Sequence, residues 1–261
     1  MSGLKEPLPN GEPPRVGLFV TCLADLLRPK LGFAAIKLLE AAGCTVEVPL
    51  GQACCGQPAF NSGATKAAAR LARRLIRLYE PYDYVVVPSG SCGGMIKTHY
   101  LEALAGDKKW LPRAEVLAAK TWELMSFLVR VRNFKPAGVT LHASATYHDS
   151  CSGLRELGIF NEPRSLLGAV EGLELRPLPE SEVCCGFGGT FCVKYADISN
   201  SIVAEKAEAA RRTGASLLLG GDLGCLINIA GKLSRNGSNM RVMHAAEVLA
   251  GMADAAIGEG E

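Results

Sequence analysis

The chain has 261 residues, 48% of them hydrophobic, which is enough for a core, so its ten cysteines do not mark a disulfide-built secreted domain. Its formal net charge of +2 comes without a basic stripe, which excludes a typical nucleic-acid-binding surface. No apolar run approaches the length of a membrane span, and the first residues show no signal-peptide core. The composition predicts a cytoplasmic protein whose thiols stay reduced and serve metal binding or redox chemistry.

Strands, helices and thiols alternate along the first half of the chain. After a proline-rich lead-in at residues 1–14, the sequence pattern predicts strand 16–20, helix 29–43, strand 45–48, helix 64–79, strand 84–87 and a largely helical stretch at 110–131. A cysteine follows each of these strands within a few residues. Such alternation is typical of a parallel sheet with crossover helices.

The same order of elements starts again after a linker at residues 133–138. The pattern there predicts strand 140–148, helix 163–170, strand 173–176, helix 198–212 and strand 216–219. The ends of the two halves are also alike, since residues 121–125 resemble residues 244–248. We therefore predict a duplicated α/β protein of two pseudo-symmetric, Rossmann-like halves with parallel sheets, a first domain at 1–136 and a second at 137–261.

Eight of the ten cysteines form two matching sets. The pair Cys54-Cys55 is followed by Gly56, and the same motif recurs as Cys184-Cys185-Gly186. A lone cysteine precedes each pair by 31 or 32 intervening residues, and another follows each pair after 36 or 39. The sets are Cys22, Cys54, Cys55 and Cys92, and Cys151, Cys184, Cys185 and Cys225. Four thiolates are the ligand count of one iron–sulfur cluster or one tetrahedral metal ion.

The predicted fold explains how thiols so distant in sequence can form one site. Ligands of open α/β sheets bind beyond the carboxyl ends of the strands, and each thiol loop here follows a strand. Several thiolates can share a site only when a metal cation balances their charge. Gly56 and Gly186 provide the backbone freedom that two adjacent cysteines need to face one group. The sequence therefore predicts one metal-binding set in each half.

The double Cys…CysCysGly…Cys arrangement resembles the CCG cysteine-rich domain. That domain occurs in one of the subunits of heterodisulfide reductase, in the iron–sulfur subunit of glycolate oxidase and in the lactate-utilisation protein A (LutA/YkgE) family. Residues 51–63 and 184–191 are similar specifically to the last of these. The resemblance implies an iron–sulfur electron-transfer subunit of a complex that oxidises L-lactate to pyruvate. Its implied partners are a ferredoxin-like iron–sulfur protein and a third, LutC-type protein.

One departure from the broader CCG pattern bears on the cofactor. That pattern ends in Cys-x-x-Cys and carries a non-cubane cluster pair in heterodisulfide reductase. In this sequence the first cysteine of that Cys-x-x-Cys is replaced by Ser89 in the first half and by Asp222 in the second. Four thiols in each half suit an ordinary [4Fe–4S] cluster, so we expect two such clusters and no disulfide reductase chemistry. Ser89 and Asp222 stay candidate oxygen ligands, and Cys192 stays a candidate fifth ligand or resolving thiol.

Other interpretations of the same residues remain open. A thiol–disulfide oxidoreductase would use the vicinal cysteine pairs. A zinc-stabilised interaction module would use all four thiols of a set. An iron–sulfur subunit can also serve another 2-hydroxy acid such as glycolate. The sequence has no convincing dinucleotide or flavin motif, so the chain alone is not expected to oxidise lactate. Cys44 has no counterpart and is expected to pack in the core. His142 and His148, on the strand before Cys151, are either structural or proton-carrying.

Overall fold

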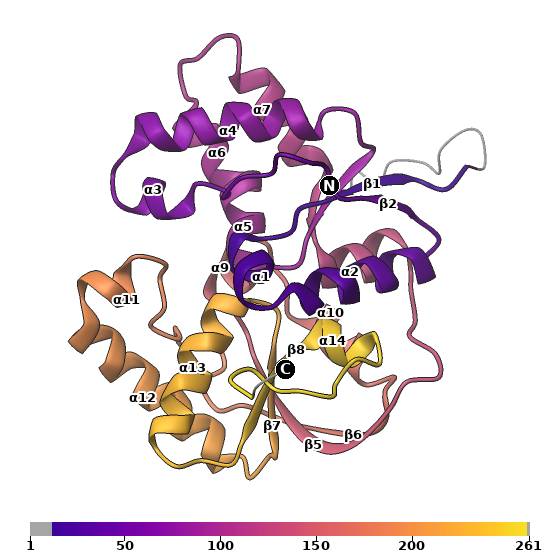
Figure 1. The fold of residues 1–261 in the computed structure, drawn as a ribbon, viewed down its shortest axis with the longest axis vertical. Helices are drawn as coiled ribbons and strands as arrows, with labels where there is room; N and C mark the ends of the chain where they lie inside the picture. The colour runs from indigo at the N-terminus through magenta and orange to yellow at the C-terminus, as the bar shows by residue number, and fades with distance from the viewer. Residues whose placement is uncertain (1–11, 260–261) are drawn as a thin grey trace.

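The duplicated α/β architecture is confirmed in a computed structural model, which describes residues 12–259. The chain forms two sheets of four strands each, and every strand pairing in them is parallel (Figure 1). Most of the lead-in predicted at residues 1–14 lies outside the described residues. Between residues 12 and 259, no helix combines the length and the apolar character that crossing a membrane requires.

The first half is built on a sheet with the strand order β2-β1-β3-β4. Its strands are β1 (Arg15–Leu18), β2 (Thr45–Glu47), β3 (Tyr84–Val87) and β4 (Thr121–Glu123). Its helices are α1 (Cys22–Leu27), α2 (Pro29–Ala41), α3 (Gln57–Asn61), α4 (Thr65–Tyr79), α5 (Gly90–Gly94), α6 (Tyr100–Ala103), α7 (Leu111–Lys120) and α8 (Leu124–Ser126), with π-helical turns η1 (Met95–His99) and η2 (Phe127–Val131).

The second half repeats this plan with the strand order β6-β5-β7-β8. Its strands are β5 (Thr140–His148), β6 (Glu171–Arg176), β7 (Leu217–Gly220) and β8 (Arg241–His244). Its helices are α9 (Cys151–Arg155), α10 (Asn161–Leu167), α11 (Phe191–Lys194), α12 (Ala196–Arg212), α13 (Leu223–Arg235) and α14 (Ala245–Leu249).

The strand register is the same in both sheets. Gly17 of β1 pairs with Val85 of β3, and the equivalent residues Thr146 of β5 and Leu218 of β7 also form a pair. The central strands β3 and β7 are short apolar runs that are buried over almost their whole length, as expected for a parallel sheet covered on both faces. Because the register is the same, equivalent loops of the two halves lie at equivalent positions beyond the strand ends.

The outer strands β4 and β8 were not predicted, and the helical prediction for residues 110–131 is wrong at 121–123. Helix α7 ends at Lys120, and the next three residues pair with β3. Strands this short show no alternation from which to distinguish them from a helix. The structure also changes the internal alignment, because Glu123 and His244 are the equivalent N-cap residues of α8 and α14.

The largest hydrophobic core lies between the two halves. It includes Leu31 of α2 and Val86 of β3 from the first half, and Leu217 of β7 and Val248 of α14 from the second. The packing is reciprocal, since α14 of the second half contacts α2 while α8 of the first half contacts α10. Two smaller clusters each belong to one half. The division into domains at 1–136 and 137–261 stays a prediction, and the shared core crosses that boundary.

Candidate functional site

The thiols of the first set all lie just beyond the carboxyl ends of strands. Cys22 begins α1 after β1, the adjacent cysteines 54 and 55 precede α3 after β2, and Cys92 lies in α5 after β3. Local hydrogen bonds fix two of these positions. The Thr21 hydroxyl accepts from the N–H of Ala24, 3.3 Å away, and caps α1, while the Ser89 hydroxyl accepts from the N–H of Cys92, also at 3.3 Å.

The four sulfur atoms of the first set form a connected chain. Cys22 Sγ lies 3.9 Å from Cys54 Sγ, and the thiol of Cys55 contacts those of both Cys54 and Cys92. The N–H of Gly56, which has a φ of 92°, donates to Cys54 Sγ over 3.5 Å. Cys55 and Cys92 are buried, whereas Cys22 is exposed. The set therefore reaches from the core to the surface.

The second set repeats these contacts one by one. The thiol of Cys184 contacts those of Cys151 and Cys185, and Cys185 contacts Cys225. The N–H of Gly186 donates to Cys184 Sγ over 3.3 Å. The structure therefore brings together the four thiols that the sequence grouped in each half. Their role as metal ligands stays a prediction.

In each set, contacts between thiols shift the pKa values of the contacting partners in opposite directions. Hydrogen bonds from neighbouring thiols lower the pKa of Cys54 and of Cys184 to about 2. The same contacts raise the pKa of Cys22 and of Cys151, with burial as the second cause. Contact between two thiols therefore favours the thiolate form of one sulfur and the protonated form of its neighbour. Four thiolates together need a metal cation, and sulfur donors fit iron, zinc or an iron–sulfur cluster.

Ser89 and Asp222, the predicted candidates for oxygen ligands, contact each other across the boundary between the halves. Ser89 Oγ donates to Asp222 Oδ2 over 3.0 Å, and the N–H of Ser91 donates to the same oxygen over 2.8 Å. Asp222 occupies the N-cap position of α13 but makes no capping hydrogen bond to that helix. The two residues therefore connect α5 of one half to the start of α13 in the other.

The remaining two cysteines lie in different surroundings. Cys192, in α11, donates its S–H to the carbonyl oxygen of Gly189 over 3.2 Å. Cys44 is buried in the core shared by the halves, where burial raises its pKa, and it lies apart from both sets as its lack of a counterpart suggested. Its position makes it a natural control thiol for experiments on the two sets.

His148 lies beside the second set. The sequence alone left its role open between a structural and a proton-carrying histidine. Its side chain is buried, and burial lowers its pKa to about 4, so the imidazole is neutral. One of its nitrogens and the sulfurs of Cys185 and Cys225 lie within 4.8 Å of one another. His142, six residues earlier on the same strand, is exposed. The only signal in the sequence for His148 was its place three residues before Cys151.

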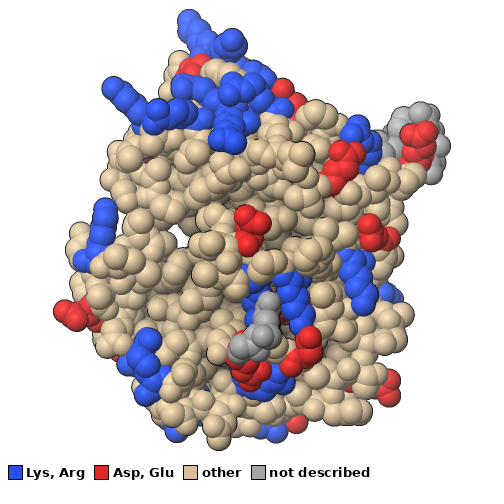
Figure 2. All heavy atoms as spheres, viewed as in Figure 1, with Lys and Arg blue, Asp and Glu red and all other residues tan. Residues whose placement is uncertain are grey.

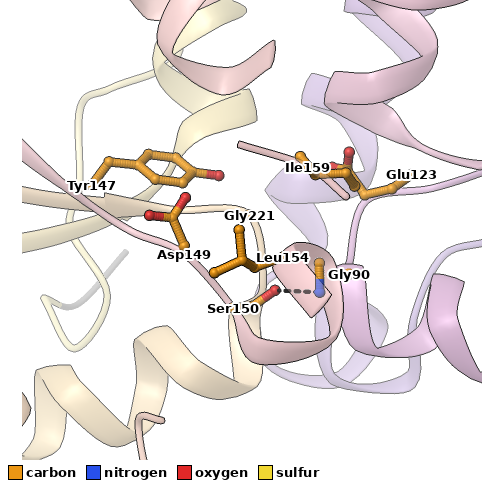
Figure 3. Close-up of a pocket in the computed structure, with 9 residues that line it drawn as sticks. Gly90, Glu123, Tyr147, Asp149, Ser150, Leu154, Ile159 and Gly221 are labelled. Carbon is orange, nitrogen blue, oxygen red and sulfur yellow. Dashed lines mark hydrogen bonds between the residues drawn. The ribbon is translucent and has the colours of Figure 1, made fainter. Parts of the chain in front are cut away.

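A small pocket between the halves was not foreseen. Figure 3 shows Tyr147 and Asp149 of the second half facing it, with Glu123 contributed by the first half. Burial raises the pKa of the Glu123 carboxyl to about 7. Arg164 donates to both oxygens of Asp149 over 2.9 and 2.7 Å. These polar groups come from residues far apart in sequence, and no spacing pattern connects them.

The molecular surface is hollowed on the side of α3 and α11, the short helices that follow the two CysCysGly loops (Figures 1 and 2). Ser62, after α3, and Thr190, before α11, approach each other there with their hydroxyl oxygens 3.3 Å apart. The largest group of Lys and Arg side chains in this view lies over α4 and α7, away from the hollow. Elements that carry the two thiol sets also touch, since α5 packs on α9 and α1 contacts α13.

Comparison with known proteins agrees with the duplicated pattern. The profile of the cysteine-rich domain family CCG matches residues 16–97 and 145–230. Lactate utilization protein A of Bacillus subtilis (strain 168) is 48% identical over 235 residues, which cover 90% of this chain and 98% of that protein. The chain belongs to the lactate utilization protein A family. The protein of the same name from Shouchella clausii (strain KSM-K16) is 50% identical over 234 residues, with the same two coverages.

Each match to the cysteine-rich domain of this family spans one complete thiol set, since the two end just after Cys92 and Cys225. Among solved structures, that of a hypothetical protein from Helicobacter pylori aligns with a TM-score of 0.68 and 14% sequence identity. The alignment covers 93% of this chain and 50% of that one. At such low identity the likeness shows the fold alone.

Proposed function

We propose that this protein is an iron–sulfur electron-transfer subunit of a cytoplasmic complex that oxidises L-lactate to pyruvate. The observation that carries the proposal is the pair of four-thiol sets at the strand ends of a duplicated sheet. Membership of the lactate utilization protein A family supports the choice of substrate. Four thiolates complete one [4Fe–4S] cluster, so the chain would hold two.

The protein side chains would serve to hold and tune the clusters. A bound cluster supplies one-electron transfer. The cysteines of each set would be its ligands, and the N–H groups of Gly56 and Gly186 donate to sulfur in both sets, which stabilises the thiolate form. The contacts of α5 with α9 and of α1 with α13 keep the two sets on neighbouring elements. This arrangement supports electron relay from one set to the other.

The proposal places the hydride chemistry in another component, because the sequence lacks a dinucleotide or flavin motif. The partners would be a ferredoxin-like iron–sulfur protein and a LutC-type protein. Exposed apolar side chains lie on helices that begin at a thiol or follow a thiol loop, and they suit such contacts. Leu26 of α1 is 77% exposed four residues after Cys22, and Val193 of α11 is 80% exposed.

Metal analysis of protein purified without oxygen tests the cofactor. We expect about eight iron and eight sulfide ions per chain, because each of the two cubanes holds four of each. Cys54→Ser and Cys184→Ser should each remove about half of both. Cys44→Ser is the control and should remove neither, because that thiol lies in the core. Stoichiometric zinc without sulfide, or colourless protein whose vicinal thiols cycle through a disulfide, would contradict the proposal.

Growth and spectroscopy test the substrate. A strain that lacks this protein should fail to grow on L-lactate and recover with the wild-type chain but not with Cys54→Ser. In the reconstituted complex, L-lactate should bleach the visible absorbance of the clusters, and glycolate should do so more slowly. Faster reduction by glycolate would assign the complex to that 2-hydroxy acid instead.

A further inference from the structure

The two halves differ at the residue three positions before the first cysteine of each set, at the carboxyl end of β1 or β5. Phe19 and His148 are equivalent, since each lies three residues before the first cysteine of its set. Phe19 is fully buried and packs on Tyr79 with the ring centroids 6.0 Å apart. His148 is 1% exposed, so an imidazole takes the place of a phenyl ring in equally dry surroundings.

The His148 imidazole lacks the partners that a structural histidine has. Neither of its nitrogens forms a hydrogen bond within residues 12–259. An unpaired buried polar group costs about 1–3 kcal/mol, so native proteins rarely leave one. A histidine that served only the fold would be paired or replaced by an apolar residue, as the first half shows with Phe19.

The orientation of the strand directs this imidazole to the second thiol set. Side chains alternate between the two faces of a strand, and Tyr147 and Asp149 face the pocket between the halves (Figure 3). His148 therefore points to the opposite face, where Cys185 and Cys225 lie. One imidazole nitrogen and these two sulfurs lie within 4.8 Å of one another, close enough together for the three donors to ligate one metal centre.

We propose that His148 is a nitrogen ligand of the metal centre in the second set, together with Cys185 and Cys225, and that it takes the place of one of the other two thiolates that the proposed function assigns to that centre. The first set would then offer sulfur donors only, and the second a mixed sulfur and nitrogen environment. Imidazole suits iron and zinc, and the choice of iron rests on the proposed function. Histidine in place of thiolate raises the reduction potential of an iron–sulfur centre. The second centre would therefore accept electrons from the first.

Nitrogen hyperfine spectroscopy tests the ligand directly. The full chain, with its histidines labelled with ¹⁵N, is reconstituted with iron and sulfide under argon, reduced and measured by pulsed electron paramagnetic resonance. We expect the strong coupling of a directly bound nitrogen in the wild type and in His142→Gln, and its loss in His148→Phe. A redox titration should show two separate midpoint potentials, with the higher one shifted down in His148→Phe.

The choice of variants keeps the experiment decisive. Phenylalanine occupies the equivalent position in the first half, so His148→Phe should fold, and His148→Gln replaces it if circular dichroism shows otherwise. His142 is an exposed histidine of the same strand and serves as the matched control. Absence of a directly bound nitrogen in the wild type, or its persistence in His148→Phe, would overturn the proposal.

A cobalt experiment separates this inference from the proposed function. If the chain takes up no iron, the proposed function fails, while the ligand role of His148 can still be tested with Co²⁺ added to the metal-free protein. X-ray absorption should then show a nitrogen donor with the sulfur donors, and His148→Phe should remove it. Cobalt bound through sulfur alone, or unchanged by the substitution, would refute the ligand role whatever the fate of iron.

Discussion

Two buried acidic side chains close to equivalent helix starts have opposite electrostatic surroundings. Glu247, in the first turn of α14, receives the guanidinium of Arg28, with Arg28 Nε 2.7 Å from Glu247 Oε1. Glu123, the N-cap of α8, accepts an N–H from Ser126 over 3.0 Å. Backbone donors offset its burial only in part, and the pKa of Glu123 is raised from 4.5 to about 7.

This pKa shift predicts that Glu123 makes stability fall as pH rises. Between pH 4.5 and about 7 the folded protein keeps a proton that the unfolded chain has released, so the free energy of unfolding decreases over that window. The full shift corresponds to about 3 kcal/mol. Glu123→Gln keeps the capping oxygen but does not titrate. Relative to the wild type, its free energy of unfolding should therefore rise by about 3 kcal/mol between pH 4.5 and 8. Urea unfolding at both pH values measures it, and an equal pH dependence in the two proteins would contradict the expectation.

Individual residues differ in how far the sequence reveals them. The eight cysteines are recognisable because a rare motif recurs at matching spacings, and the parallel fold then explains how each set meets. His148 and Glu123 carry no such signal. A single histidine or glutamate in a strand looks the same whether it faces a metal site, a pocket or solvent, and only the tertiary structure decides which.

At the scale of elements, the turn after each cysteine pair depends on glycine for reasons that differ between the halves. Gly56 and Gly186 both have positive φ, 92° and 79°. A Cβ on Gly56 would meet the side chain of Leu71 at 3.5 Å and the Cα of Ala68 at 3.8 Å, both ordinary contacts. A Cβ on Gly186 would lie 2.7 Å from the carbonyl oxygen of Ser199, which is backbone of α12 and cannot move aside.

The alanine substitutions should therefore have unequal effects. Gly56→Ala bears mainly the left-handed backbone strain, about 1–2 kcal/mol. Gly186→Ala bears the same strain and must also displace α12, so it should destabilise the protein more and reduce metal content in the second set first. Urea unfolding and iron content per chain measure both effects. Equal losses for the two variants would show that the clash with Ser199 is relieved elsewhere.

Elements were predictable where they are long or strongly patterned. The amphipathic α4 has a clear helical period, the strands β3 and β7 are unbroken apolar runs, and the positions of all three were predicted almost to the residue. The edge strands β4 and β8, of three and four residues, are each defined by pairing with one neighbouring strand, β3 or β7. Pairing of this kind is a tertiary effect that short-range sequence patterns do not contain.

At the scale of the whole molecule, the halves approach so closely in places that only glycine fits. A Cβ on Gly90 of α5 would lie 2.6 Å from Ser150 Oγ and 2.9 Å from the Cα of Gly153 in α9. The buried pair of Arg28 and Glu247 forms a second connection, with side chains only 6% and 0% exposed. At both places the two halves are in direct, buried contact.

Removing one member of that ion pair should destabilise the whole protein. Arg28→Met leaves the Glu247 carboxylate buried without its cation, which costs about 3–5 kcal/mol. Arg28→Met combined with Glu247→Leu should recover much of that loss. The exposed pair Arg15–Glu47, with side chains 52% and 43% exposed, is the matched control, and Arg15→Met should cost far less than Arg28→Met because solvent screens an exposed pair. Urea unfolding measures the destabilisation by each substitution. Equal costs for Arg28→Met and Arg15→Met would mean that the burial of the Arg28 pair adds nothing to its contribution.

The shared core predicts that neither half folds fully by itself. Cut at the predicted boundary, fragment 1–136 would expose Leu31 and Val86 to water, and fragment 137–261 would expose Leu217 and Val248. Each fragment would thus lose the largest apolar cluster while keeping only a small one of its own. We expect weak, non-cooperative unfolding for each fragment and recovery of a single cooperative transition when the two are mixed in equal amounts. Near-ultraviolet circular dichroism during a urea titration measures this. A fragment that unfolds cooperatively alone would instead support two autonomous domains joined at that boundary.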